Sequence, residues 1–201
     1  MSRAQDILAW WFEGADDASP IGPGSPCYQR WFRGGAAVDA QVALRYRDDV
    51  QAARTGALDG WRGSARSELA LILLLDQFPR HLYRGRAEAF DSDEAALAIA
   101  RESIASGRDE SLALVERIFV YLPIQHSERI ADHALAFERF RALEAQARAR
   151  NAGVAALCTG AVGEQQAHFD TLQRFGRYPG RNAALGRSST PAELAYLASL
   201  K

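Results

Sequence analysis

The chain has 201 residues, of which 48% are hydrophobic and 24% charged, and its net charge is −1. This near-neutral charge argues against a general affinity for nucleic acid or anionic membranes. The longest apolar run, Leu69 to Leu75, is far shorter than the roughly 20 residues of a membrane helix. The N-terminus also lacks the pattern of a secretory signal peptide. We therefore expect a cytoplasmic protein with no nucleic-acid or membrane partner.

Helical periodicity extends along nearly the whole chain, and no segment shows the alternation of a strand. The residues from Ser2 to Gln5 form a capping box that predicts the start of the first helix. Prolines and glycines in residues 13–26 predict a loop. Apolar residues at helical spacing then predict a helix that ends at Gly56, a favourable C-terminal cap; they are Val38, Val42, Tyr46, Val50 and Ala53.

The segment from Ser67 to Gln77 is apolar on all sides, which predicts a buried central helix that Pro79 ends. If Leu73 lies in this core, Leu73→Ala should cost about 2–5 kcal/mol of stability. Further helices are predicted over residues 91–106, 111–121, 127–150 and 154–175, with a last one after Thr190. Ser127 is the predicted cap of the third of these five, and Pro123 the end of the second. The sequence thus predicts an all-α fold of about eight helices in one domain, residues 1–201.

The segment from Arg174 to Arg187 combines four arginines, three glycines and a proline, and contains no acidic residue. Arginine can grip a carboxylate or phosphate with two parallel hydrogen bonds. We expect Arg177 and Arg181 to lie near Arg80 and His126 around one polar cavity. Since like charges repel, either protein carboxylates or a bound anion must compensate the arginines.

Several sequence words occur in a characteristic order: Leu75-Asp-Gln-Phe-Pro-Arg80, Tyr83-Arg-Gly85, Tyr121-Leu-Pro123, His126-Ser-Glu128, and the segment from Arg174 to Thr190. In this order they resemble the bacterial family catalogued as domain of unknown function 924. The resemblance implies a fold like that of tetratricopeptide-repeat proteins, with helix hairpins in a right-handed stack. It implies no activity. Gly180 stands where that family often has histidine, which excludes a mechanism that requires a histidine at this position.

The candidates for acid–base chemistry are His126, Glu128 and His168. Because residues one or two apart on a helix do not face each other, His126 needs a partner from another segment. Glu128 is also explained by a favourable place at a helix start, and Asp76 by pairing with an arginine.

Glu164 and His168, four residues apart, face each other on a helix, but the histidines and cysteines lack metal-ligand spacing. We expect no metal and no cofactor. The candidate ligand-binding residues are Asp76, Arg80, Arg84, His126, His168, Arg174, Arg177, Arg181 and Asn182.

Three functions compete. The first is a pocket that binds, and can act on, a small anionic metabolite; a compact cavity lined by arginine and histidine would favour it. The second is a helical scaffold for a peptide or protein partner, favoured by an open channel with an apolar floor. In the third, the arginines only tie loops to the core through carboxylates such as Asp76, Glu128, Asp132 and Asp170. Arginine side chains fully occupied by carboxylates would favour that interpretation.

Overall fold

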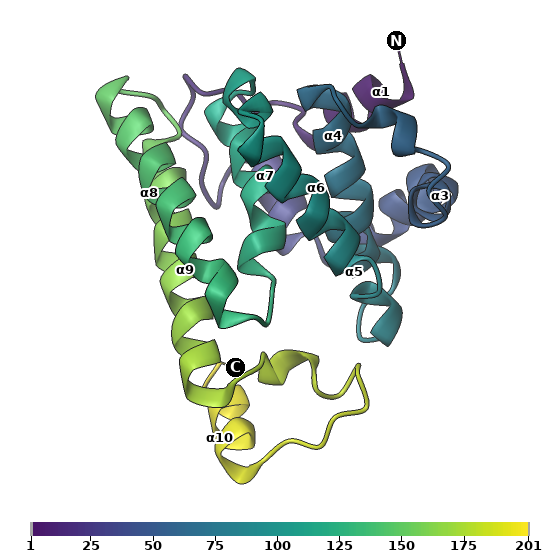
Figure 1. Cartoon of the computed structure of the whole chain (residues 1–201), viewed down its shortest axis with the longest axis vertical. Coiled ribbons are helices and arrows are strands. Elements are labelled where there is room, and N and C mark those ends of the chain that lie inside the picture. The colour runs from purple at the N-terminus through teal and green to yellow at the C-terminus, as the bar shows by residue number, and fades with distance from the viewer. Residues whose placement is uncertain (1, 201) are drawn as a thin grey trace.

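The computed structural model describes residues 2–200, and within them the regular secondary structure is entirely helical (Figure 1). This confirms the all-α prediction. The α-helices are α1 (Arg3–Trp11), α2 (Pro26–Tyr28), α3 (Gly35–Arg54), α4 (Ala65–Ile72), α5 (Phe78–Leu82), α6 (Asp93–Ala105), α7 (Leu114–Gln125), α8 (His133–Ala149), α9 (Ala155–Phe175) and α10 (Pro191–Ser199). A tetratricopeptide-like stacking of helix hairpins is compatible with this arrangement and stays a prediction.

The predicted central helix lies in the core. Every residue from Leu69 to Leu75 is buried, and α4 packs against α1, α6 and α7. A helix that is apolar all round requires such neighbours on every side. The hydrophobic core is continuous from α1 to the first half of α9.

Pro79 does not end the central helix, contrary to the prediction. The chain passes from α4 through a π-helical turn, Leu73–Gln77, into α5, which contains Pro79. A proline ring clashes with the carbonyl four residues earlier in an α-helix and supplies no N–H to it. Here the wider π turn relieves the clash, and the hydroxyl of Ser92 donates to the orphaned carbonyl of Leu75 at 2.7 Å.

Two other helix boundaries differ from the prediction. Helix α7 continues through Pro123 to Gln125, where the buried side chains of Ile124 and Gln125 hold its last turn in the protein interior. Ser127 caps no helix, because its hydroxyl instead donates to Asp132 across a short 3-10 turn, and α8 begins only at His133. The capping box predicted at Ser2 is confirmed, and the helix predicted after Thr190 begins with a second capping box at that residue.

The C-terminal half of the chain sets up the site. Helix α8 runs antiparallel to both α7 and α9, so α7 and α9 run in the same direction (Figure 1). After Gly176, which has a positive φ and ends α9 as predicted, residues 177–190 cross the lower end of these helices towards α6 (Figure 1). In the described part of the chain, no helix has both the length and the hydropathy that a membrane crossing requires.

Candidate functional site

A cavity of about 570 Å³ lies between α7, α9, the junction of the π-helical turn with α5, and segment 21–33, which contains α2. This volume is in the usual range for pockets that bind small molecules. Its polar lining consists of Arg33, Gln77, Arg80, Gln125, His126, Glu164 and His168. The remaining wall is formed by apolar residues and glycines: Ile21, Gly22, Pro23, Tyr28, Phe32, Ile118, Leu122, Ala156, Leu157, Gly160 and Ala161.

Asp76 is the partner from another segment that His126 requires. The Nδ1 atom of His126 lies 2.8 Å from Oδ1 of Asp76, which is fully buried in the π-helical turn. Burial alone would raise the pKa of Asp76, but Arg80 and then His126 favour its charged form and hold the pKa below its ordinary value. A carboxylate only accepts hydrogen bonds, so the proton of a neutral His126 sits on Nδ1.

The other ring nitrogen of His126, Nε2, makes no hydrogen bond with any described residue, and the side chain lies on the cavity wall. Burial lowers the pKa of His126 below its ordinary value of 6.5, which outweighs the opposite effect of Asp76. His126 is therefore neutral at pH 7, with an unprotonated Nε2. A neutral imidazole oriented by a buried carboxylate has the arrangement of a general base.

His168 from α9 adds a second imidazole, with its ring centroid 6.3 Å from that of His126. Its Nδ1 lies 2.8 Å from the backbone carbonyl of Glu164 and 2.9 Å from the side-chain amide nitrogen of Gln125. The contact with the carbonyl oxygen requires a protonated Nδ1 that donates. The contact with the amide nitrogen requires an unprotonated Nδ1 that accepts. Turning the Gln125 amide by 180° satisfies both, because the amide oxygen, which otherwise has no partner, then accepts from Nδ1. Burial also lowers the pKa of His168.

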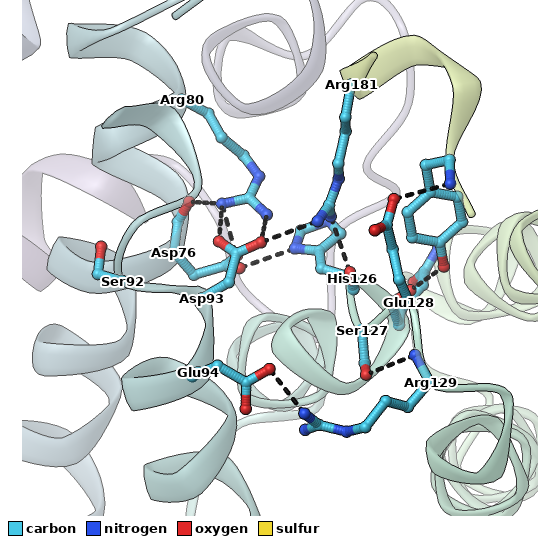
Figure 2. Close-up of polar contacts among 12 residues, drawn as sticks. Asp76, Arg80, Ser92, Asp93, Glu94, His126, Ser127, Glu128, Arg129 and Arg181 are labelled. Atoms are coloured by element: carbon cyan, nitrogen blue, oxygen red, sulfur yellow. Dashed lines mark hydrogen bonds and ion pairs between the residues drawn. The ribbon is translucent and has the colours of Figure 1, made fainter. Parts of the chain in front are cut away.

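Two arginines meet at Asp93, at the N-terminus of α6 (Figure 2). Arg80 makes two hydrogen bonds to Asp93, at 2.9 and 3.1 Å, and lies 3.3 Å from Oδ1 of Asp76. Arg181 comes from the opposite side, 3.2 Å from Asp93, and donates to the backbone carbonyl of His126. The predicted proximity of Arg181, Arg80 and His126 is confirmed. Two arginines and two aspartates balance one another here, so protein carboxylates supply the compensating charge.

Arg177 lies elsewhere, and its predicted place at this cavity is wrong. Its guanidinium donates at 2.7 and 2.9 Å to Glu193 on α10 and at 2.8 Å to the Ser188 carbonyl. These bonds lower the pKa of Glu193 to about 2. The prediction failed because Pro179 and Gly180 redirect the chain, so that Arg181 turns towards α6 while Arg177 faces α10.

The other predicted residues also pair away from the cavity. Glu128 accepts from the Tyr178 backbone N–H and from both terminal nitrogens of Arg187, which leaves it no free oxygen for acid–base work. Arg84 grips Asp39 in the same two-pronged way. Asn182 is buried and donates to Ser189, and Arg174 is exposed and lies over the rings of Phe175 and Tyr196.

We expect Arg177→Ala to lower the melting temperature, since Glu193 is buried and loses the only cation that pairs with it among residues 2–200. If a bound anion compensated this arginine in place of Glu193, the variant would instead be as stable as the parent or more stable, because repulsion among the arginines would be relieved. Arg174→Ala is the matched control from the same segment and should leave the melting temperature unchanged. Equal melting temperatures for both variants and the parent would show that the pair with Glu193 contributes nothing.

A family model described as "Bacterial protein of unknown function (DUF924)" matches residues 7–200. The chain belongs to this family. A solved structure of a protein of unknown function from Agrobacterium tumefaciens is 36% identical to this DUF924 chain, with a TM-score of 0.78 and 96% of each chain covered. The comparison with curated proteins gave no match.

Three polar residues that line the cavity of this DUF924 protein were not predicted from the sequence: Arg33, Gln77 and Gln125. Gln77 could not be placed, because the π turn that carries it depends on tertiary packing around Pro79. Gln125 was recoverable in principle, since it follows Ile118 and Leu122 on one helical face. Among residues 2–200, no group of three or more histidine, cysteine, aspartate or glutamate side chains could hold a metal ion.

Proposed function

We propose that this protein binds a small anionic ligand in the cavity between α7 and α9, with the charged group beside Arg80, His126 and His168. The observation that carries the proposal is the state of His126. Its Nδ1 is held by a buried carboxylate, the residue lines a cavity of ligand size, and its Nε2 has no hydrogen-bond partner among the described residues. His126 is the residue we expect to transfer a proton if the ligand is also a substrate.

The charge balance suggests how an anion is held. Arg80 and Arg181 are already compensated by Asp76 and Asp93, so the ligand does not replace a missing carboxylate. An anion instead favours protonation of the two neutral imidazoles, His126 and His168. Arg33, exposed at the cavity wall and without an ion pair in the described part of the chain, adds a further positive charge.

The competing interpretations apply to different arginines. Arg84, Arg177 and Arg187 are occupied by carboxylates, which supports a structural role for these three. The compact cavity with one arginine and two histidines at one end supports the ligand-binding role for Arg80, His126 and His168.

We expect butanoate to bind more tightly as the pH falls from 7.5 to 5.5. The pKa values of His126 and His168 are below 6.5 in the free protein, and a neighbouring anion raises them, so binding takes up protons. The groups whose charges act on these rings are Asp76, Arg80 and Asp93 for His126, and Arg80, Arg181 and His133 for His168. The affinity should increase by up to about tenfold per pH unit for each proton taken up.

Calorimetric titration at several pH values, in buffers of different ionisation heat, measures both the affinity and the proton uptake. His126→Asn should reduce both, because asparagine can still donate to Asp76 but takes up no proton. His133→Asn is a poor control, since His133 is buried in the core; His81→Asn, whose imidazole pairs with Asp39 outside this cavity, is the suitable one. Binding that is independent of pH in the parent would contradict the proposal.

A further inference from the structure

We infer that the ligand is a carboxylate with an extended apolar body of about six to eight carbons, and that Gly160 keeps open the space in which this body lies. The inference rests on the proposed function for the charged end and extends it to the chemical class of the ligand. It stands on the distribution of polar and apolar side chains along the two helices that form the cavity.

Helix α7 presents a polarity gradient to the cavity. Ile118, Leu122, Gln125 and His126 line it at spacings of four, three and one residues, which places them along one helical face. The face is apolar at Ile118 and Leu122 and becomes polar at Gln125 and His126. The distance from first to last is about 12 Å at 1.5 Å per residue.

Helix α9 carries the same gradient in the same direction. Its lining residues begin with Ala156, Leu157, Gly160 and Ala161 and end with Glu164 and His168. Because α7 and α9 run parallel, their polar ends coincide, as the contact between Gln125 and His168 shows directly. The cavity therefore has one apolar end and one polar end, and segment 21–33 closes it with Tyr28 and Phe32.

A ligand that matches this cavity has its charge at one end and hydrocarbon along the rest. An extended carbon chain advances about 1.2 Å per bond, a third of the advance per residue of an extended peptide. The roughly 12 Å between Ile118 and His126 thus accommodates a chain of about six to eight carbons and its carboxylate. The exposed ring of Phe32 at the cavity wall provides an aromatic surface that covers this carbon chain.

Gly160 has no structural reason to be glycine. It lies inside α9 with an ordinary helical φ, and a Cβ atom built on it meets no atom within 4 Å. Glycine weakens a helix relative to almost any other residue. At a position where the backbone requires no glycine and packing would allow a side chain, its effect is to leave cavity volume free next to Leu157 and Ala161.

The first experiment measures the affinity of the full chain for butanoate, hexanoate and octanoate by titration calorimetry at pH 6, with octan-1-ol as the neutral analogue. Each methylene that enters the apolar end should tighten binding by about two- to fourfold. Octanoate should therefore bind at least tenfold more tightly than butanoate. Equal affinities for the three carboxylates would overturn the inference and leave the proposed function standing.

The neutral analogue, octan-1-ol, distinguishes the proposed anion site from the inferred binding of an apolar chain. Octan-1-ol should bind at least tenfold more weakly than octanoate. If octan-1-ol bound as tightly as octanoate while the carboxylates still showed a chain-length dependence, binding at the apolar end of the cavity would be supported and the proposed anion site refuted. If none of these compounds bound, both would be refuted.

The second experiment fills the apolar end of the cavity with a larger side chain. Gly160→Leu should lower the affinity for octanoate at least tenfold and leave that for butanoate unchanged, with a melting temperature no lower than that of the parent. Gly163→Leu is the matched control, because Gly163 lies in the same helix with equally open surroundings but does not line the cavity. The control should bind both compounds as the parent does. A Gly160→Leu protein with parental octanoate affinity would overturn the inference.

Discussion

Replacing Asp76 with alanine should lower the free energy of unfolding by about 3 kcal/mol, the lower end of the range for a buried ion pair that loses one partner. Asp76 is fully buried and contacts both Arg80 and His126. Without it, Asp93 is the one carboxylate partner left to Arg80 among the described residues, and the Nδ1 of His126 loses its acceptor. The lower end applies because the Arg80 side chain is 22% exposed and still reaches water.

Urea denaturation at pH 7 measures this effect, with two controls. Asp76→Asn keeps the shape of the side chain and one hydrogen-bond acceptor, so it should be less destabilising than Asp76→Ala. Glu94→Ala, at an exposed carboxylate that pairs with Arg129, should cost less than about 1 kcal/mol. A loss below 1 kcal/mol for Asp76→Ala would mean that the carboxylate does not hold Arg80 and His126 in place.

Leu73→Ala should lower the free energy of unfolding by about 2–5 kcal/mol. Leu73 is fully buried in the middle of the core, where α4 meets the π-helical turn. The variant loses the transfer free energy of the removed methyl groups and leaves a cavity that its neighbours fill only in part. The helices packed against this turn, α3, α6 and α7, all have to relax for the cavity to close.

Leu44→Ala is the control for the same substitution on the surface. Leu44 is 88% exposed on α3, so its loss should change stability by less than about 0.5 kcal/mol. The same chemical denaturation measures both variants. A cost for Leu73→Ala as small as that for Leu44→Ala would show that the core has been placed wrongly.

The helices were predictable because they follow from local rules. Apolar spacing located α3 through Val42, Tyr46 and Val50, and the caps at Ser2, Gly176 and Thr190 are short-range hydrogen-bond patterns. The failures at Pro79, Pro123 and Ser127 share one cause. In each case a distant or tertiary interaction, such as that of Ser92 with the Leu75 carbonyl, overrides the local preference.

The candidate site was predictable only in part. The arginines and His126 were found, because charge clusters and helix-end histidines are visible in sequence. Their partners were not, since sequence distance gives no information on which carboxylate meets which arginine. Of the proposed carboxylates, Asp76 and Glu128 do pair with these arginines, whereas Asp132 pairs with Arg101 and Arg129. Asp93 and Glu193 were missed.

The apolar half of the cavity could not be derived from the sequence. Ile118 and Leu122 have the spacing of ordinary core residues, and nothing local distinguishes a residue that lines a cavity from one that fills the core. The sequence does not distinguish Gly160 either, because Gly163 in the same helix has equally open surroundings, and only its place on the cavity wall sets Gly160 apart. Its surroundings are visible only in three dimensions.

The most direct test of the ligand site is the imidazole ¹H–¹⁵N spectrum of the protein during titration with octanoate. The chain has four histidines, and their ring signals can be assigned by single substitutions. In the free protein at pH 7, His126 should be the neutral tautomer with its proton on Nδ1. On addition of octanoate, the signals of His126 and His168 should move saturably towards the protonated form, while those of His81 and His133 stay in place. Unchanged signals of His126 and His168 in the presence of bound octanoate would contradict the proposed site.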